Sequence, residues 1–318
     1  NERLQKQVMI VVLGPTATGK TSFAARLAHS IGGEIISADS RQVYRGMDIG
    51  TGKDYSDYIV DGKKIRHHLI DIAEPGMEYS VFNFRKDFRD AYNDIVRRGK
   101  VPVLCGGSGM YIESVLKGYR LTYVPRNEQL RKKLRSMPHE DLVQMLKDLR
   151  PVHNITDTED PDRLIRAIEI GVYYRDHPMN GDQPPRIDDY VLLGIRFERG
   201  EIRERIRNRL HKRLREGMVD EVESLLSTLL QPEQLRFYGL EYRYVTDHLT
   251  GKLSHEEMAA SLETAIHRFA KRQSTWFRKM EREGFAIHWI DGHLSMEKKI
   301  ETALGILQDE AYDFSASR

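Results

Sequence analysis

The apolar positions of the first 118 residues follow two alternating patterns. Short β-branched or apolar runs stand at 7–14 (QVMIVVLG), 32–39 (GGEIISAD), 67–72 (HHLIDI) and 101–107 (VPVLCGG). Segments with apolar residues at helical spacing follow at 20–31, 81–100 and 108–118. Strands that alternate with helices in this way predict a mostly parallel β-sheet covered by helices on both faces.

The pattern changes after about residue 118, because only helical periodicity remains from 126 to 176. A loop dense in Pro, Gly and Asp follows at 177–189, and a strand returns in YVLLGIRF. The remainder reads as helix until a last strand near 285–291. We therefore predict one α/β core, formed by 1–119 and 190–318, with a small all-helical insertion domain at 120–189.

The composition is that of a soluble globular protein, with 40% hydrophobic and 31% charged residues in a chain of 318. No apolar run approaches the roughly 20 residues that a membrane span needs. The N-terminal segment lacks the apolar stretch of a secretory signal. The single cysteine, Cys105, excludes an intramolecular disulfide and a cysteine-rich zinc site. We predict a cytoplasmic protein that acts as a monomer and does not contact a membrane.

Basic residues gather in three segments of a chain whose net charge is only +2. These segments are 120–135, 196–216 and 263–283. Each is consistent with a solvated helix face stabilised by charge pairs four residues apart. Three such segments in one near-neutral chain favour a polyanionic partner that docks on one face.

The stretch GPTATGKT (14–21), called the phosphate loop below, matches G-x-x-x-x-G-K-[ST] in full. It follows a predicted strand and opens a predicted helix, which is the structural context that the motif requires. Glycines let backbone N–H groups turn toward an anion, and the helix N-terminus adds partial positive charge. The motif predicts a P-loop NTPase-like core whose phosphate-binding residues are Gly14, Thr16, Ala17, Thr18, Gly19, Lys20 and Thr21. The Thr21 hydroxyl would bind Mg²⁺, the predicted cofactor.

The motif does not specify which molecule carries the phosphate. A nucleoside triphosphatase usually has an acidic residue at the end of an apolar strand. The strand VPVLCGG ends in glycines instead, whereas HHLIDI contains Asp71. Nucleotide binding, including ATP binding, therefore stays open at this point.

A second group of polar residues follows the predicted strand at 32–39. Asp39 stands where that strand ends, and Ser40, Arg41 and Gln42 follow it. Ligands of open α/β sheets bind outside the carboxyl ends of the strands. The Asp39 carboxylate would accept a proton there, hold Mg²⁺ or cap the next turn.

Several motifs together resemble one enzyme family. The stretches GPTATGKT, ISADSRQVYRGMDIGTGK, GGSGMY, DPDRLIRAIEI and AKRQSTWFRK occur here in the order typical of tRNA dimethylallyltransferases. The resemblance runs from about residue 8 to 290. DSRQVYRGMDIGT and KRQSTWFR are far more specific than the phosphate loop alone.

The resemblance implies transfer of a prenyl group from dimethylallyl diphosphate to the exocyclic amine of the adenosine next to the tRNA anticodon on its 3′ side. The phosphate loop would hold the prenyl diphosphate, with Lys20 and Mg²⁺ at Thr21 stabilising the leaving group. Asp39 would be the base, and Ser108 and Arg209 would be further catalytic residues. Ser108 stands where the family usually has Thr, and a helix cap is its alternative role.

By the same resemblance, tRNA would contact Asp39, Ser40, Arg41, Gln42, Ser108, Arg131, Asp162, Arg163, Arg166, Arg236, Tyr238, Arg243 and Arg272. Asp162 replaces a more usual Gln, and its charge weakens that contact. Arg131, Arg163 and Arg166 are equally consistent with surface helix charges. Arg213 stays unassigned because its position is often apolar in relatives, and Trp276, His67 and His68 are interpreted as structural.

Access to the site adds a geometric expectation. A stacked anticodon-loop adenine must turn outward to enter a pocket in an α/β core. The insertion would clamp the anticodon stem-loop, with Arg120, Arg126 and Arg131 at its base. Binding through these residues should weaken as salt rises.

Three other functions stay open from the sequence. A P-loop kinase of a small molecule would share the phosphate loop, but the motifs DSRQVYRGMDIGT and KRQSTWFR argue against this function. An adenylate isopentenyltransferase, acting on free AMP, ADP or ATP, shares the loop and the aspartate but needs no clamp. A silent RNA-binding module is disfavoured because Lys20, Thr21 and Asp39 are all present.

Overall fold

The computed structural model describes residues 8–119, 121, 123–149, 156–177, 187–228, 230–312 and 314. The chain forms two compact units, residues 1–117 with 186–318, and residues 118–185. These bounds lie within a few residues of those expected for the core and the insertion.

The larger unit contains a six-stranded sheet. Its strands are β1 (Met9–Leu13), β2 (Gly33–Ser37), β5 (His67–His68), β6 (Val101–Gly106), β7 (Tyr190–Arg196) and β8 (Ile287–Asp291). They stand in the order β5-β2-β6-β1-β7-β8, and every neighbouring pair is parallel. The prediction of a parallel α/β sheet, including the last strand, is confirmed.

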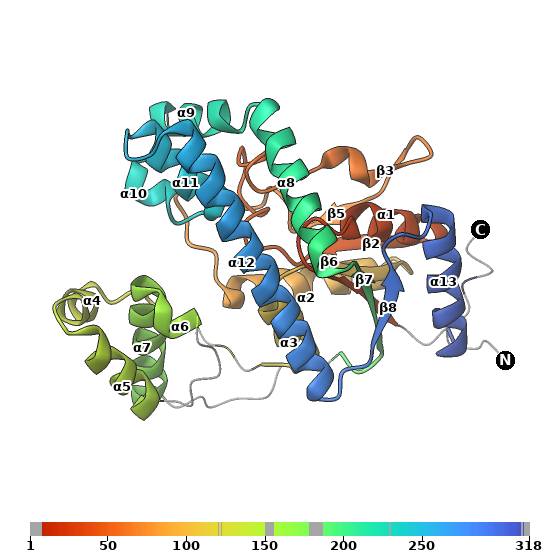
Figure 1. Ribbon diagram of the computed structural model, residues 1–318. Helices are drawn as coiled ribbons and strands as arrows, with labels where there is room; N and C mark the ends of the chain where they lie inside the picture. The colour runs from red at the N-terminus through yellow and green to blue at the C-terminus, as the bar shows by residue number, and fades with distance from the viewer. Residues whose placement is uncertain are drawn as a thin grey trace. The chain divides into compact units, whose positions relative to one another are not determined.

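Helices cover both faces of this sheet (Figure 1). α1 (Lys20–Ile31) and α13 (Met296–Asp309) pack on one face, whereas α2 (Val81–Arg97), α3 (Gly109–Leu116) and α12 (His255–Arg282) pack on the other. Successive side chains of a strand point to opposite faces, so Ile10 and Val12 join the first core and Met9, Val11 and Leu13 the second. Both faces of β1 are therefore apolar, as its continuous hydrophobic run predicts.

A third apolar cluster lies beyond the carboxyl ends of the strands. It brings together the segment after β2, α8 (Arg199–Arg215), α9 (Met218–Thr228), α10 (Pro232–Leu235), α11 (Leu240–Leu249) and the first half of α12. Tyr44 and Tyr242 are its largest fully buried side chains. The Glu221 carboxylate accepts hydrogen bonds from the Tyr242 hydroxyl (2.5 Å) and from the backbone N–H groups of Asp48, Ile49 and Gly50. This cluster fixes the loop that follows Asp39.

The smaller unit contains α4 (Glu128–Arg135), α5 (His139–Leu149), α6 (Thr156–Glu159) and α7 (Pro161–Asp176). Its own core includes Leu134, Leu142, Leu146 and Leu164. Asp160 caps α7 by accepting hydrogen bonds from the N–H groups of Asp162 and Arg163. Because these helices bury one face each in a core of their own, apolar residues recur at helical spacing along this segment.

Two local features differ from the expectations. The strand expected at 67–72 pairs over only two residues, because Leu69 (φ 65°) and Asp71 (φ 57°) adopt left-handed conformations that end the extended chain. A short antiparallel hairpin, β3 (Ile59–Val60) with β4 (Lys63–Lys64), and the short 3₁₀ helix η1 (Tyr55–Tyr58) were not anticipated. In the part of the chain that the structure describes, no helix has the length and apolar character needed to cross a membrane.

Candidate functional site

The phosphate loop leaves β1 and turns directly into α1. Gly19 has φ 76° and Ala17 has φ 65°, a left-handed conformation that glycine adopts easily and alanine does not. The Thr18 hydroxyl donates to the Pro15 carbonyl (2.8 Å), and Arg205 Nε donates to the Ala17 carbonyl (2.8 Å). These contacts hold a tight turn at a helix N-terminus, where free N–H groups and the helix dipole favour an anion.

Lys20, at the first position of α1, has an unusual electrostatic environment. Burial lowers its pKa to about 8; Arg209 adds to the decrease, and Cys105 and Asp39 oppose it. Its Nζ donates to the Pro15 carbonyl (3.2 Å) and forms no ion pair with any described residue. A bound anion would stabilise this ammonium group. Thr21 follows it, half-buried, on the same helical turn.

Two arginines of α8 face this loop. Arg209 Nη1 donates to the Thr16 hydroxyl (3.1 Å), and its Nη2 lies 3.2 Å from the Asp54 carboxylate. Arg213, one turn further on, is 9% exposed, and its Nη2 is buried without a hydrogen-bond partner among the described residues. Burial and the neighbouring Arg209 lower the pKa of Arg213 to about 10. Lys20 and both guanidinium groups thus form a positive cluster around the phosphate loop.

Asp39 lies just beyond β2, at the same sheet edge as the phosphate loop. Its Oδ1 accepts hydrogen bonds from the N–H groups of Arg41 (2.8 Å) and Gln42 (3.4 Å). The capping role considered for Asp39 is therefore present, and it uses only one carboxylate oxygen. Gln42 also donates from Nε2 to the Gly52 carbonyl (3.1 Å), so its side chain holds the loop after Asp39.

Ser108 is the N-cap residue of α3, but its hydroxyl makes no capping hydrogen bond. The preceding residue, Gly107, accepts a hydrogen bond through its carbonyl from Gln273 Nε2 (3.0 Å). Gln273 Oε1 in turn accepts from the N–H of Thr16 (2.9 Å). The sequence reasoning did not assign Gln273, although it belongs to the KRQSTWFR motif.

The aromatic residues near Asp39 differ from the prediction. Tyr238, a predicted tRNA contact, is only 3% exposed, and its hydroxyl accepts from the Gly76 N–H (2.6 Å). The neighbouring Phe237 is 53% exposed, and the Arg41 guanidinium lies 5.3 Å from its ring centroid. Phe237, which the sequence reasoning missed, is therefore the accessible aromatic side chain here, because α10 and α11 turn Tyr238 into the core.

The other arginines predicted to contact tRNA in the larger unit divide into two kinds. Arg236 Nε donates to Asp247 (2.8 Å), so its guanidinium belongs to a local ion pair. Arg243 and Arg272 are exposed, and Arg272 lies 5.9 Å from the Phe269 ring centroid.

The residues of the insertion that were predicted to contact tRNA also differ in their surroundings. Arg131 Nε and Nη2 donate to the Glu169 carboxylate (3.0 and 2.7 Å), and Arg166 binds the same carboxylate and the Val124 carbonyl. Burial opposes ionisation of Glu169, but these hydrogen bonds outweigh it and lower its pKa to about 2. Arg131 and Arg166 thus serve a structural network within the small unit. Asp162 and Arg163 are exposed on the first turn of α7. Arg120 falls outside the described residues.

The alternative ATPase carboxylate has another partner. Asp71 Oδ1 lies 2.5 Å from Nζ of the fully buried Lys53, and its other oxygen accepts from the Tyr55 hydroxyl. Asp71 therefore balances a buried lysine instead of facing the phosphate loop. The histidines read as structural also have local contacts: His68 Nε2 lies 2.8 Å from Glu34, and His67 packs against Tyr58. Trp276 packs against Gly109 and is partly buried.

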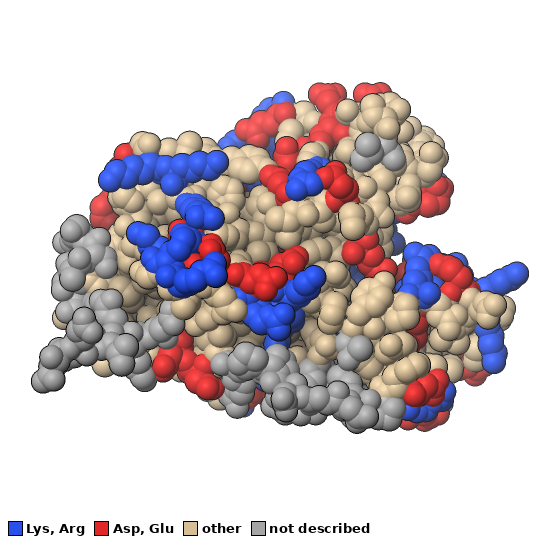
Figure 2. All heavy atoms as spheres, turned by 180° about the vertical axis from the view of Figure 1, so that it is seen from behind, with Lys and Arg blue, Asp and Glu red and all other residues tan. Residues whose placement is uncertain are grey.

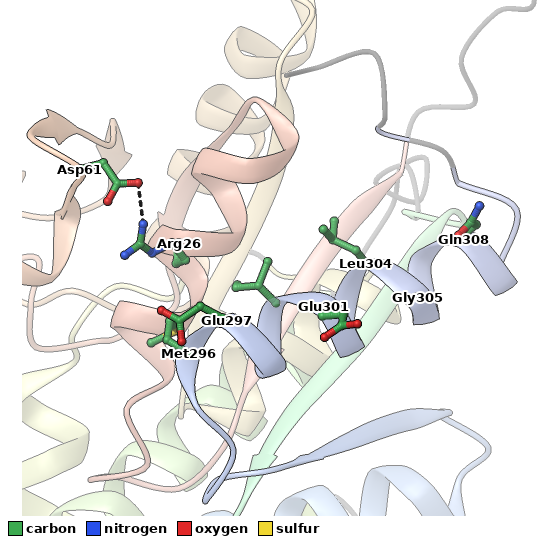
Figure 3. Close-up of a pocket in the computed structure, with 9 residues that line it drawn as sticks. Arg26, Asp61, Met296, Glu297, Glu301, Leu304, Gly305 and Gln308 are labelled. Atoms are coloured by element: carbon green, nitrogen blue, oxygen red, sulfur yellow. Dashed lines mark hydrogen bonds and ion pairs between the residues drawn. The ribbon is translucent and has the colours of Figure 1, made fainter.

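A large cavity lies elsewhere in the larger unit. It has a volume of about 760 Å³ and is lined by α13, Arg26 and Asp61 (Figure 3). None of its lining residues belongs to the phosphate loop or to the segment after Asp39. A much smaller cavity, about 20 Å³, touches Thr16, Ala17, Arg209, Arg213 and Glu241.

Surface charge is mixed on one face of the molecule. On the face drawn in Figure 2, basic and acidic side chains are interspersed. Among the described residues, no group of three or more His, Cys, Asp or Glu side chains is arranged to hold a metal ion. The site is distinguished by the convergence of the phosphate loop, the cationic groups of Lys20, Arg209 and Arg213, and the Asp39 carboxylate.

Comparison with known proteins decides the family. The model described as "IPP transferase" matches residues 42–280, and that described as "Isopentenyl transferase" matches 7–71. The chain is 53% identical to tRNA dimethylallyltransferase 1 of Parabacteroides distasonis, over 95% of this chain and 98% of that protein. The chain belongs to the tRNA dimethylallyltransferase family. It is 50% identical to the family member from Geotalea daltonii, over 95% of each chain.

Solved structures of the family share the fold. The tRNA isopentenylpyrophosphate transferase of Bacillus halodurans superposes with a TM-score of 0.70 at 30% identity, over 98% of this chain and 99% of that one. A eukaryotic dimethylallyltransferase acting on tRNA gives a TM-score of 0.73 at 21% identity, which supports the fold alone. The P-loop NTPase-like core predicted from the sequence is confirmed. The chain is an enzyme of the prenyltransferase class, and the kinase and adenylate alternatives are not favoured.

Proposed function

We propose that this enzyme transfers a dimethylallyl group from dimethylallyl diphosphate to the N6 amine of the adenosine that follows the tRNA anticodon on its 3′ side. The products are N6-(dimethylallyl)adenosine and diphosphate. The observation that carries the proposal is the charge arrangement at the phosphate loop. Lys20 and Arg209 supply positive charge to an anion, whereas Asp71, the alternative acid, is bound to Lys53.

The residues of the site fit this reaction. An adenine amine is a weak nucleophile because its lone pair is delocalised into the ring, so the leaving group and the geometry must supply the acceleration. The N6–C1 bond forms while the bond from C1 to the diphosphate oxygen breaks, and the phosphate-loop amides, Lys20 and Arg209 stabilise the departing charge. The Asp39 oxygen that does not cap the turn accepts the amine proton. The Ser108 hydroxyl, which makes no capping hydrogen bond to α3, offers a further donor.

Mg²⁺ fits the same site. It is commonly held by one or two protein groups together with substrate phosphates. The Thr21 hydroxyl is one such group, and the absence of a three-residue acidic or histidine cluster among the described residues agrees with ligands drawn mainly from the substrate. When bound, the ion would neutralise charge on the diphosphate.

The proposed partner is the tRNA anticodon stem-loop. Arg41, next to Asp39, supplies a cation beside the aromatic face of Phe237, and Arg243 and Arg272 are further exposed cations of the same unit. Bases of single-stranded RNA stack on such side chains. The exposed Arg163 belongs to the helical insertion, which we propose clamps the stem. We keep the predictions of a monomer and of a cytoplasmic location.

Transfer of a labelled prenyl group tests the proposal. The purified enzyme is incubated with labelled dimethylallyl diphosphate and either unmodified tRNA or free AMP, and a parallel sample receives γ-labelled ATP. We expect label only in tRNA, at the adenosine 3′ to the anticodon. Replacing Asp39 by Ala should reduce kcat by at least about a hundredfold while the Kd for tRNA changes little. Label in AMP alone, or phosphate transfer, would refute the proposal.

A further inference from the structure

Gln273 connects two loops that lie far apart in the sequence. It stands on α12 and is 7% exposed. Its Oε1 accepts a hydrogen bond from the N–H of Thr16 in the phosphate loop, and its Nε2 donates to the carbonyl of Gly107 in the turn after β6. One side chain therefore joins the phosphate loop to the turn that carries Ser108.

The chemistry of the two partners selects an amide at this position. A backbone N–H can only donate and a backbone carbonyl can only accept, so the orientation of the Gln273 amide is unambiguous. A glutamate would retain the acceptor for Thr16, but its second oxygen would face the Gly107 carbonyl without a proton. An alanine would leave both backbone groups without a partner.

Gly107 makes room for this bridge. A Cβ at this position would overlap Nε2 of Gln273, and it would also lie in tight contact with the Gly14 carbonyl, at 3.2 Å. Two residues later, a Cβ at Gly109 would overlap the Trp276 ring instead. The two glycines thus let α12 approach the turn after β6 through two separate contacts, one polar and one aromatic.

Thr16 is held from two sides. Its N–H points to Gln273 of α12, and its hydroxyl accepts from Arg209 of α8. That N–H is therefore unavailable to an anion, and Thr16 contributes to the site as the fixed junction of two helices.

We propose that Gln273 is a positioning residue that sets the separation between the phosphate loop and the turn carrying Ser108. It would act through these two loops, without touching either substrate. This inference rests on the proposed prenyl transfer, since the two loops then hold the leaving diphosphate and a hydroxyl at the same reacting centre. Misplacement of reacting groups by about 1 Å costs on the order of a hundredfold in rate.

The first test separates kcat from KM in Gln273→Ala and Gln273→Glu. We expect kcat for prenyl transfer to fall about ten- to a hundredfold in both, while the Kd for inorganic diphosphate changes less than about threefold. Thr264→Ala, at an exposed position of the same helix, is the matched control and should retain the wild-type kcat. A kcat within about threefold of the wild type in Gln273→Ala, measured well below its Tm, overturns the proposal.

The second test is a double-mutant cycle that needs no activity. Gly107→Ala should lower Tm by several degrees in the wild type, because the new methyl group overlaps Nε2, and by less than half as much in Gln273→Ala. Gly109→Ala should cost the same in both backgrounds, because it meets Trp276. Equal losses for Gly107→Ala overturn the bridge. If the wild type transfers no prenyl group, the proposed function fails while this cycle still tests the contact; transfer without coupling defeats the inference alone.

Discussion

Arg209 donates a hydrogen bond from Nη1 to the hydroxyl of Thr16 at 3.1 Å, across 193 positions of the chain. This contact brings a guanidinium from the most basic segment of the sequence to the phosphate loop. Not every arginine of α8 reaches this loop. The exposed Arg207, two residues before Arg209, donates to Glu263 instead.

Arg209→Met should reduce kcat/KM for dimethylallyl diphosphate by roughly a hundred- to a thousandfold, as when a preorganised donor to a developing anion is removed. Steady-state prenyl transfer to tRNA measures it. Arg207→Met on the same helix should stay within about threefold of the wild type. Similar losses in the two variants would indicate a general charge effect and contradict a specific role.

The affinity for inorganic diphosphate should fall as pH rises through about 8. Burial lowers the pKa of Lys20 to about 8, so the free enzyme loses this cation above that pH, and a bound anion raises the pKa again. Calorimetry in buffers of different ionisation enthalpy should show proton uptake on binding near pH 8.

The same titration has an internal control. Arg209 is among the groups that lower the pKa of Lys20, so Arg209→Met should move the midpoint of the pH dependence upward. A midpoint that stays in place or moves down would contradict this electrostatic assignment.

Glu169 should hold the helical insertion together. It is 2% exposed and binds two arginines, so Glu169→Ala leaves the partly buried Arg131 and Arg166 without their carboxylate and should destabilise the small unit by about 1–3 kcal/mol. Hydrogen exchange in α4 and α7 should report this loss, and Glu140→Ala, at an exposed site of α5, should not change it.

The contribution of Glu169 has a defined pH dependence. Its pKa in the folded unit, about 2, is below the usual value of 4.5. Its stabilising effect should therefore be complete above pH 4.5 and disappear as the pH falls toward 2. Protection of α7 that is independent of pH across this range would refute the assignment.

Phe237 and Tyr238 should behave differently. Base stacking on an aromatic side chain contributes about 1–3 kcal/mol, so Phe237→Ala should raise the Kd for tRNA about five- to a hundredfold without changing the KM for the prenyl diphosphate. Tyr238→Phe should instead lower Tm, because the Gly76 N–H loses its acceptor, and should leave the Kd for tRNA unchanged. Ile59→Ala, at another exposed apolar residue, is the binding control.

Much of the fold could be predicted because local patterns encode it. β1 is buried on both faces, so its apolar residues form a continuous run. α1 is buried on one face only, so its apolar residues recur at helical spacing. The residues at 59–64 were not recognised as a hairpin, because a two-residue pairing leaves too short a pattern. The predicted third strand is limited to His67 and His68, because the positive φ of Leu69 ends the extended conformation.

The candidate site could be predicted only where its chemistry is local. The phosphate loop is a backbone structure, so eight consecutive residues suffice to specify it. By contrast, nothing local distinguishes Arg209, which faces the loop, from Arg131, which is bound to Glu169. Both belong to basic helical segments, and their partners lie on other segments of the chain.

The amino-acid sequence thus specifies the alternating α/β core, the helical insertion, the phosphate loop and the family. The tertiary structure decides which equivalent side chains reach the site: Phe237 is exposed where Tyr238 is buried, and Gln273 joins Thr16 to Gly107. The physical reason is that backbone conformation and apolar period depend on near neighbours. The exposure and partners of a polar side chain depend on how distant segments pack.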